Sequence, residues 1–165
     1  MLNKQFKYPD TKAYNFVVDR FHEKGIHLHQ LSDIAYDLQH EFNPKITKKA
    51  AYDMLIDVMH KRELLNNAMV ALELDRLAEE GKIKEPLQSI IRNDSGVFGV
   101  DEALALQISN IYGTIGVTNF GYLDRVKYGI IKSFDEDPNH VNTFIDDILG
   151  AIVAALCGKI AHHYA

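Results

Sequence analysis

Residues 140–163, "HVNTFIDDILGAIVAALCGKIAHH", form one of the most apolar stretches of the chain and decide how the rest must fold around it. The uncharged run at its centre, residues 148–158, ends at Lys159. A membrane-spanning helix needs about 20 consecutive apolar residues, which is more than this run supplies. We therefore predict a buried core helix over about residues 140–162 and no transmembrane segment.

The two sides of this predicted helix differ in side-chain size when the residues are placed at 100° intervals. The small or polar side comprises Thr143, Asp147, Gly150, Ala154 and Ala161. The large apolar side comprises Ile145, Leu149, Ile152 and Leu156. Small residues allow another backbone to come close, so we expect a central helix with neighbours on most sides. The adjacent Asp146 and Asp147 would then lie near one end of a bundle.

The rest of the chain shows helical periodicity and almost no alternating β-branched runs, which indicates an all-α fold. We expect helices over about residues 10–23, 30–42, 48–80 and 101–112, and a short helix after Pro86. Thr47 is a suitable N-cap for the third, which is either one long helix or two with a break near Arg62. The glycine-rich segment 113–139 is predicted to be a long irregular connection. The prediction is a single domain over residues 1–165, a compact multi-helix bundle with its C-terminal helix in the centre.

Composition and charge exclude several classes of protein. The chain has 165 residues, 47% of them hydrophobic, and a formal net charge of -5 without a dense Lys/Arg cluster, so we expect no nucleic-acid partner. The single cysteine, Cys157, has apolar neighbours and suggests a buried thiol in a reducing compartment. The first residues, "MLNKQFKYPDTKAY", lack the apolar run of a secretory signal. We expect a cytoplasmic protein; peripheral membrane contact and homo-oligomerisation stay open.

Two pairs of acidic residues stand at the starts of predicted helices. Asp146 and Asp147 open the core helix, and Asp101 and Glu102 in "GVFGVDEALALQIS" open another. Carboxylates in a first helical turn need no function, because the helix dipole and the free N–H groups favour them there. Two such pairs at one end of a bundle can also form an oxygen cage for Mg²⁺, or for Mn²⁺. Both interpretations remain open at this point.

Between the two acidic pairs lies "LDRVK", which contains Asp124 and Lys127. Exposed loop charges are usually only solvated. Close to a metal ion, however, the lysine can hold a phosphate oxygen and the aspartate can ligate the metal or orient a water molecule. In contrast, His27 and His29 in "HLH" are two residues apart and do not share a helix face, which argues against a metal site there.

The order of these motifs resembles that of the phosphatidylglycerophosphatase A family, which carries a DE pair, an FD-x-x-K-P segment and an M-x-DD helix. The similarity is greatest to its soluble branch of YutG-like or low-temperature-requirement C proteins. It extends over "EPLQSIIRND", "VDEALAL", "IYGTIGVTNFGYLD" and "VNTFIDDI". Two family features differ: Tyr128 follows the lysine in place of proline, and the amino-terminal P-G-T motif has no counterpart.

The resemblance implies a compact helical bundle with a Mg²⁺-dependent phosphatase activity on phosphatidylglycerophosphate. Six positions match the family's motif residues: Asp101, Glu102, Asp124, Lys127, Asp146 and Asp147. We therefore expect a phosphohydrolase that acts on such a lipid or on a soluble phosphate ester. Asp101, Glu102, Asp146 and Asp147 would hold metal, Asp124 would ligate it or act as general base, and Lys127 would stabilise the transferred group.

Two alternatives belong to other classes. The chain can be a non-catalytic helical protein that retains the acidic site and acts through self-association or a partner. Alternatively, it can be a nucleotide pyrophosphohydrolase, since acidic all-α bundles also carry out that reaction.

Overall fold

The computed structural model describes residues 5–165, and all regular elements of this part are helices. The first four residues of the amino-terminal stretch considered above lie outside it. The α-helices are α1 (Asp10–Glu23), α2 (Leu28–Gln39), α3 (Lys48–Met59), α4 (Arg62–Glu79), α5 (Leu87–Arg92), α6 (Val100–Ser109), α7 (Thr114–Val126), α8 (Gly129–Asp135) and α9 (Ile145–His163). A 3₁₀ turn, Asn110–Tyr112, joins α6 to α7.

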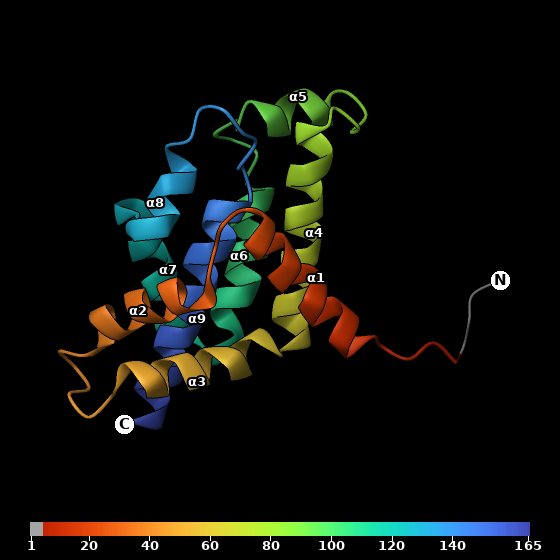
Figure 1. Cartoon of the computed structure of the whole chain (residues 1–165). Coiled ribbons are helices and arrows are strands. Elements are labelled where there is room, and N and C mark those ends of the chain that lie inside the picture. Colours follow the sequence, from red (N-terminus) through yellow and green to blue (C-terminus); the bar gives the residue numbers. More distant parts are fainter. Residues whose placement is uncertain (1–4) are drawn as a thin grey trace.

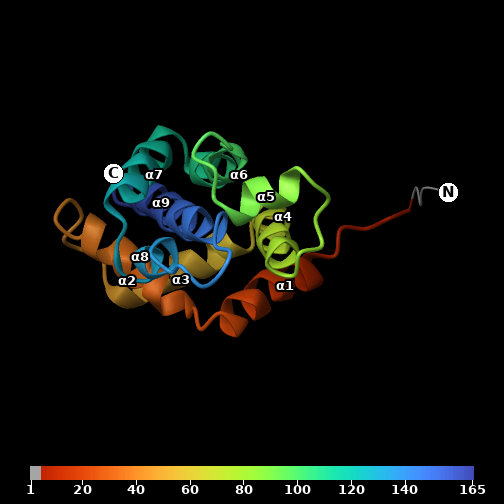
Figure 2. The same cartoon turned by 90° about the horizontal axis from the view of Figure 1, so that it is seen from above.

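Helix α9 is the centre of the bundle, as the sequence predicts. Every residue from 145 to 158 is buried, and helices α2, α3, α4, α6, α7 and α8 all pack against it. Figure 2 shows these helices arranged around α9, and Figure 1 shows α3 crossing the lower part of α9. Among residues 5–165, no helix combines the length and apolarity that a bilayer crossing requires.

The small side of α9 receives α7, the helix with which it shares its most extensive contact. A methyl group on Gly158 would lie 3.3 Å from the backbone nitrogen of Gly116, and one on Gly150 would lie 3.7 Å from the Phe120 ring. Gly116 is tighter still, since a Cβ there would stand 1.9 Å from the carbonyl oxygen of Ser109. The stripe of small residues therefore serves close packing of two helices within the chain.

The prediction of an irregular segment over residues 113–139 is wrong, because α7 and α8 lie within it. Glycine lowers helix propensity, and this composition was therefore interpreted as a loop. In the structure Gly113, with a φ of 81°, precedes α7, and Gly129, with a φ of 48°, is the first residue of α8, while Gly116 is required by packing. Tertiary contact with α9 thus overrides the weak local preference.

The other helix predictions hold with shifted ends. The long signal over 48–80 is two helices, with the break at His60 and Lys61, and the Thr47 hydroxyl accepts a hydrogen bond from the Ala50 N–H at 3.1 Å. Helix α9 begins at Ile145 and not near residue 140, because residues 141–144 make hydrogen bonds to other parts of the bundle.

Candidate active site

The six residues singled out from the sequence line one pocket at the start of α9. The pocket has a volume of about 230 Å³ and lies between α6, the end of α7, α8 and α9. Its walls include Asp101, Glu102, Asp124, Lys127, Asp146 and Asp147, together with Asp94, Ser95, Gly96, Gly99, Asp135 and Thr143. The structure thus brings together six predicted residues that lie up to 46 positions apart in the sequence, from Asp101 to Asp147.

Helix ends deliver the charged side chains to this pocket. Asp146 and Asp147 occupy the first turn of α9, and Asp101 and Glu102 occupy the first turn of α6. Gly99, which precedes α6, has a φ of 65°, a left-handed conformation that glycine adopts without a Cβ penalty. The structural interpretation of the acidic pairs as first-turn residues is therefore correct, and it coexists with their convergence on one pocket.

Lys127 stands at the centre of the acidic residues. It follows the last residue of α7, and its φ of 53° is rare for a residue with a side chain. The Nζ atom lies 2.8 Å from Asp146 Oδ2, 3.1 Å from Asp124 Oδ1, 3.5 Å from Asp135 Oδ1 and 3.6 Å from Asp147 Oδ1. The surrounding carboxylates, Asp146 foremost, raise the pKa of Lys127 despite its burial, so the ammonium stays charged.

The carboxylates outnumber this single cation. Burial raises the pKa of Asp146 to about 6, although the Lys127 ammonium opposes the shift. Burial and the neighbouring Asp146 raise the pKa of Asp147 to about 8. The pKa of Glu102 is also raised, by burial and by Asp101. The pocket therefore favours protonation or the arrival of further positive charge.

A residue that the sequence analysis missed fixes the start of α9. Asp75 of α4 is only 1% exposed and accepts hydrogen bonds from the Phe144 N–H at 3.1 and 3.2 Å and from the Ile145 N–H at 2.9 Å. Burial raises its pKa to about 8, although these backbone donors oppose the shift. In the sequence, the one sign of this role was that Asp75 places a charge on the apolar side of α4. Asp75 caps α9 from another helix and so orients the turn that carries Asp146.

Comparison with known proteins places the chain in a family. The sequence model described as Phosphatidylglycerophosphatase A matches residues 27–162. The chain belongs to the phosphatidylglycerophosphatase A family. Within it, the chain is 40% identical over 161 residues to the uncharacterized protein YutG of Bacillus subtilis, covering 97% of this chain and 95% of that one. It is 38% identical to the uncharacterized protein YpjQ of the same organism, over 94% of this chain and 88% of that one.

Solved structures of relatives share the fold. The low temperature requirement C protein from Listeria monocytogenes superimposes with a TM-score of 0.85 at 40% identity, over 94% of this chain and 96% of that chain. A Bacillus stearothermophilus protein of unknown function gives a TM-score of 0.87 at 40% identity, over 98% of each chain. The family resemblance seen in the motifs is thereby confirmed over almost the whole chain.

The family implies a metal ion, and the chemistry of this pocket fits one. Its donors are carboxylate oxygens, the ligands that Mg²⁺ and Mn²⁺ prefer, and the buried Oδ1 atom of Asp101 has no hydrogen-bond partner in the structure. As the side chains of residues 5–165 stand, no three acidic, histidine or cysteine groups are arranged to hold a metal. Lys127 fills the space between the aspartates, so a metal would require its ammonium to move aside.

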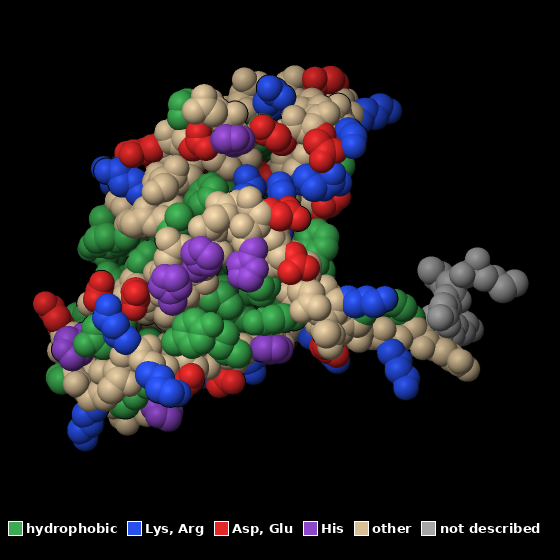
Figure 3. Space-filling model, in the orientation of Figure 1, with side chains coloured by type: hydrophobic (Ala, Val, Ile, Leu, Met, Phe, Trp, Pro, Cys, Tyr) green, Lys and Arg blue, Asp and Glu red, His purple; other side chains and the backbone are tan. Residues whose placement is uncertain are grey.

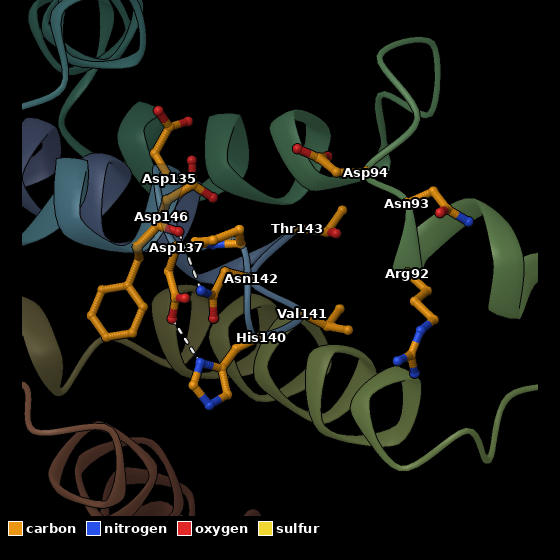
Figure 4. Close-up of a pocket in the computed structure, with 12 residues that line it drawn as sticks. Arg92, Asn93, Asp94, Asp135, Asp137, His140, Val141, Asn142, Thr143 and Asp146 are labelled. Atoms are coloured by element: carbon orange, nitrogen blue, oxygen red, sulfur yellow. Dashed lines mark hydrogen bonds and ion pairs between the residues drawn. The ribbon is translucent and has the colours of Figure 1, made fainter.

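A second polar cavity of about 220 Å³ adjoins the acidic pocket at the start of α9 (Figure 4). The two share Asp94, Asp135, Thr143 and Asp146 as lining residues. In Figure 4, Asp135, Asp137 and Asp146 lie on one side, whereas Arg92, Asn93 and Asp94 lie on the other. Asp94 and Asp135 had not been singled out from the sequence, since isolated carboxylates near a turn carry no distinguishing pattern.

His27, His29 and Cys157 lie outside the acidic pocket. The rings of His27 and His29 stack at 5.7 Å between centroids on the surface, far in sequence from the acidic pocket, and they belong to no metal-holding group among residues 5–165. Cys157 is fully buried as predicted, and burial raises its thiol pKa to about 12.

Proposed function

We propose that this protein is a metal-dependent phosphohydrolase that cleaves a phosphate monoester in the acidic pocket. The observation that carries the proposal is the convergence of Asp101, Glu102, Asp146 and Asp147, from two separate helices, around Lys127. Membership in a family named for phosphatidylglycerophosphate hydrolysis supports the same reaction class.

The acidic residues would hold Mg²⁺ or Mn²⁺ through Asp101, Glu102, Asp146 and Asp147. When bound, such a metal neutralises phosphoryl charge and lowers the pKa of water. The Lys127 ammonium, released from some of its aspartates, would bind a non-bridging oxygen of the phosphate. Its position beside Asp124 keeps that carboxylate at the pocket rim, where it can accept a proton.

In the reaction, a water oxygen forms a bond to phosphorus and the bond between phosphorus and the alcohol oxygen breaks. Asp124 takes a proton from the attacking water and returns it to the oxygen of the leaving alkoxide, so that inorganic phosphate and a free alcohol result.

Phosphate release with and without Mg²⁺ tests the proposal directly. Asp146→Asn should lower Mg²⁺-dependent turnover by about 100-fold or more while the circular dichroism spectrum stays helical. Asp53→Asn is the control, because Asp53 lies exposed on α3 and pairs with the surface Lys49. Unchanged turnover in Asp146→Asn would overturn the mechanism.

A non-catalytic role is the second candidate, and the Lys127 contacts favour it. Because this ammonium partly balances the aspartates, the pocket has a structural explanation without a reaction. In that case, the wild type would show metal-induced stabilisation and no turnover of phosphate monoesters, and the protein would act through self-association or a partner. Pyrophosphate release from nucleoside triphosphates would instead identify a pyrophosphohydrolase.

A further inference from the structure

The connection between α7 and α8 consists of two residues, and one of them carries the ammonium of the acidic pocket. Helix α7 ends at Val126 and α8 begins at Gly129, so Lys127 and Tyr128 form the whole connection. Lys127 has a φ of 53° and a ψ of 107°, a left-handed backbone that residues with a side chain rarely adopt. Gly129 follows with a φ of 48°. Such a turn costs free energy, and the surrounding contacts must hold it.

Backbone hydrogen bonds hold the connection on each side. The Lys127 N–H donates to the Leu123 carbonyl oxygen at 2.8 Å and closes the end of α7. The Tyr128 carbonyl oxygen accepts a hydrogen bond from the Ile131 N–H at 2.9 Å, at the start of α8. Each bond fixes the end of its own helix, and neither spans the connection between the two helices.

The hydroxyl groups of Tyr122 and Tyr128 span this connection. Their oxygen atoms lie 2.7 Å apart, and the ring centroids lie 6.1 Å apart at an interplanar angle of 47°. Tyr122 lies in the last turns of α7, and Tyr128 is the N-cap residue of α8. The contact therefore closes a loop of chain that contains Asp124 and Lys127, which both line the acidic pocket.

Both tyrosine side chains lie at the surface, outside the acidic pocket. Figure 3 shows hydrophobic side chains at the left edge of the molecule, beside α7 and α8. The Lys127 side chain, in contrast, is only 15% exposed, and its Nζ atom lies 2.8 Å from Asp146 Oδ2. An effect of the tyrosine pair on the pocket therefore has to pass through the backbone of Lys127.

We propose that Tyr122 and Tyr128 are positioning residues whose mutual hydrogen bond holds the connection between α7 and α8, and with it the Lys127 ammonium against the aspartates of the pocket. The pair itself contacts neither substrate nor metal. It fixes the conformation in which Lys127 reaches Asp124 and Asp146, and from which the ammonium then binds the phosphate. This last step rests on the proposed function, whereas the effect on the conformation of Lys127 does not.

The place of Lys127 in the pocket predicts two opposite consequences of removing the tyrosine contact. The ammonium fills the space between the aspartates, so a metal ion must displace it in order to bind. A looser connection lets Lys127 withdraw at a lower cost, and the affinity for metal rises. The same freedom leaves the ammonium less well placed for the phosphate, and turnover falls. General damage to the pocket would instead lower both, because the carboxylates would also lose their places.

The test uses Tyr122→Phe, Tyr128→Phe and the double variant, which remove hydroxyl oxygens and keep the rings. Amide hydrogen exchange, measured by NMR, should be about 3-fold faster or more at Lys127 and unchanged in α3. The calorimetric affinity for Mn²⁺ should rise by about 3-fold, while kcat for 4-nitrophenyl phosphate should fall by about 3-fold or more. Because the two hydroxyls form one bond, the double variant should show the same effects as either single variant.

Tyr52→Phe is the matched control, because it removes a hydroxyl from an exposed tyrosine of α3 that lies outside the acidic pocket. It should change neither exchange at Lys127, nor Mn²⁺ affinity, nor kcat. The proposal is overturned by unchanged exchange at Lys127, by additive effects of Tyr122→Phe and Tyr128→Phe, or by a loss of Mn²⁺ affinity in these variants.

A failure of the proposed function gives a different result from a failure of this inference. If the wild type hydrolyses no phosphate monoester, the proposed function fails, but faster exchange at Lys127 in the variants still establishes the positioning role and unchanged exchange still overturns it. If the wild type is active and the variants keep its kcat, the tyrosine pair does not serve the reaction, and the inference fails while the proposed function stands.

Discussion

The first turn of α9, the acidic end of the helix, differs in composition from its apolar body. Its first turn carries Asp146 and Asp147, buried at 8% and 6% exposure beside the Lys127 ammonium. Its body, from residue 148 to residue 158, contains no charge and packs α7 against glycine and alanine. Burying carboxylates costs free energy, whereas close apolar packing supplies it. We infer that the body of α9 stabilises the bundle and that its first turn is retained at a cost to stability because it binds or reacts.

The largest effect on stability should follow a change in α7, the helix that packs against the body of α9. Gly116→Ala places a Cβ 1.9 Å from the carbonyl oxygen of Ser109 at the end of α6, so α7 must shift away from α6, and we expect a loss of about 3 kcal/mol in the free energy of unfolding. Urea denaturation measures it. Gly121→Ala, in the same helix with open space around its Cβ, should be neutral or stabilising by up to about 1 kcal/mol. Equal effects of the two variants would contradict the packing account.

A smaller loss is expected at the start of α9, where a carboxylate of α4 caps the helix. Asp75→Ala leaves the Phe144 and Ile145 N–H groups without an acceptor and should lower the free energy of unfolding by about 2 kcal/mol. It should also reduce Mg²⁺-dependent turnover, measured well below the melting temperature, because the turn that bears Asp146 loses its anchor. Asp57→Ala, at an exposed carboxylate that pairs with Lys159, should change stability by less than about 1 kcal/mol and turnover not at all.

The acidic end should respond in the opposite direction, by a smaller amount. Asp147→Asn removes a buried charge and should raise stability at pH 8 by on the order of 1 kcal/mol. The pKa of Asp147 is raised to about 8 in the fold, so the folded state binds its proton more tightly than the unfolded chain. Wild-type stability from this group is therefore present near pH 4 and lost as the pH rises through about 8.

The difference between Asp147→Asn and the wild type should accordingly shrink as the pH is lowered from 8 to 5. Thermal unfolding across this range provides the measurement. A variant that is less stable than the wild type at pH 8, or a difference that grows on acidification, would contradict a cost at this end of α9.

The sequence predicted the central helix well, because uncharged length and the separation of small from large residues are properties of one segment. The convergence of Asp101, Asp124 and Asp146 was also accessible, through the order of their motifs. The helix at 114–126 was missed, since Gly116 and Gly121 lower local helix propensity and only the close approach to Ser109 at the end of α6 explains the former. The composition of a segment does not reveal which other helices it will contact.

Residues whose role depends on a contact with another helix could not be predicted from the sequence either. Asp75 binds backbone N–H groups 69 and 70 residues away, and Asp135 reaches Lys127 from α8, which was itself expected to be irregular. A charge on the buried stripe of α4 was the single local sign of Asp75. Partners for backbone atoms follow from tertiary placement, which a single sequence specifies only indirectly.

Calorimetric titration of Mn²⁺ into the wild type and Asp147→Asn, without substrate, tests the central claim most directly. If the acidic end of α9 is a metal site kept at a cost to stability, the wild type binds Mn²⁺ and the variant loses at least about 10-fold in affinity while melting at the same or a higher temperature. Absence of Mn²⁺ binding in the wild type, or equal affinity in the variant, would contradict the account.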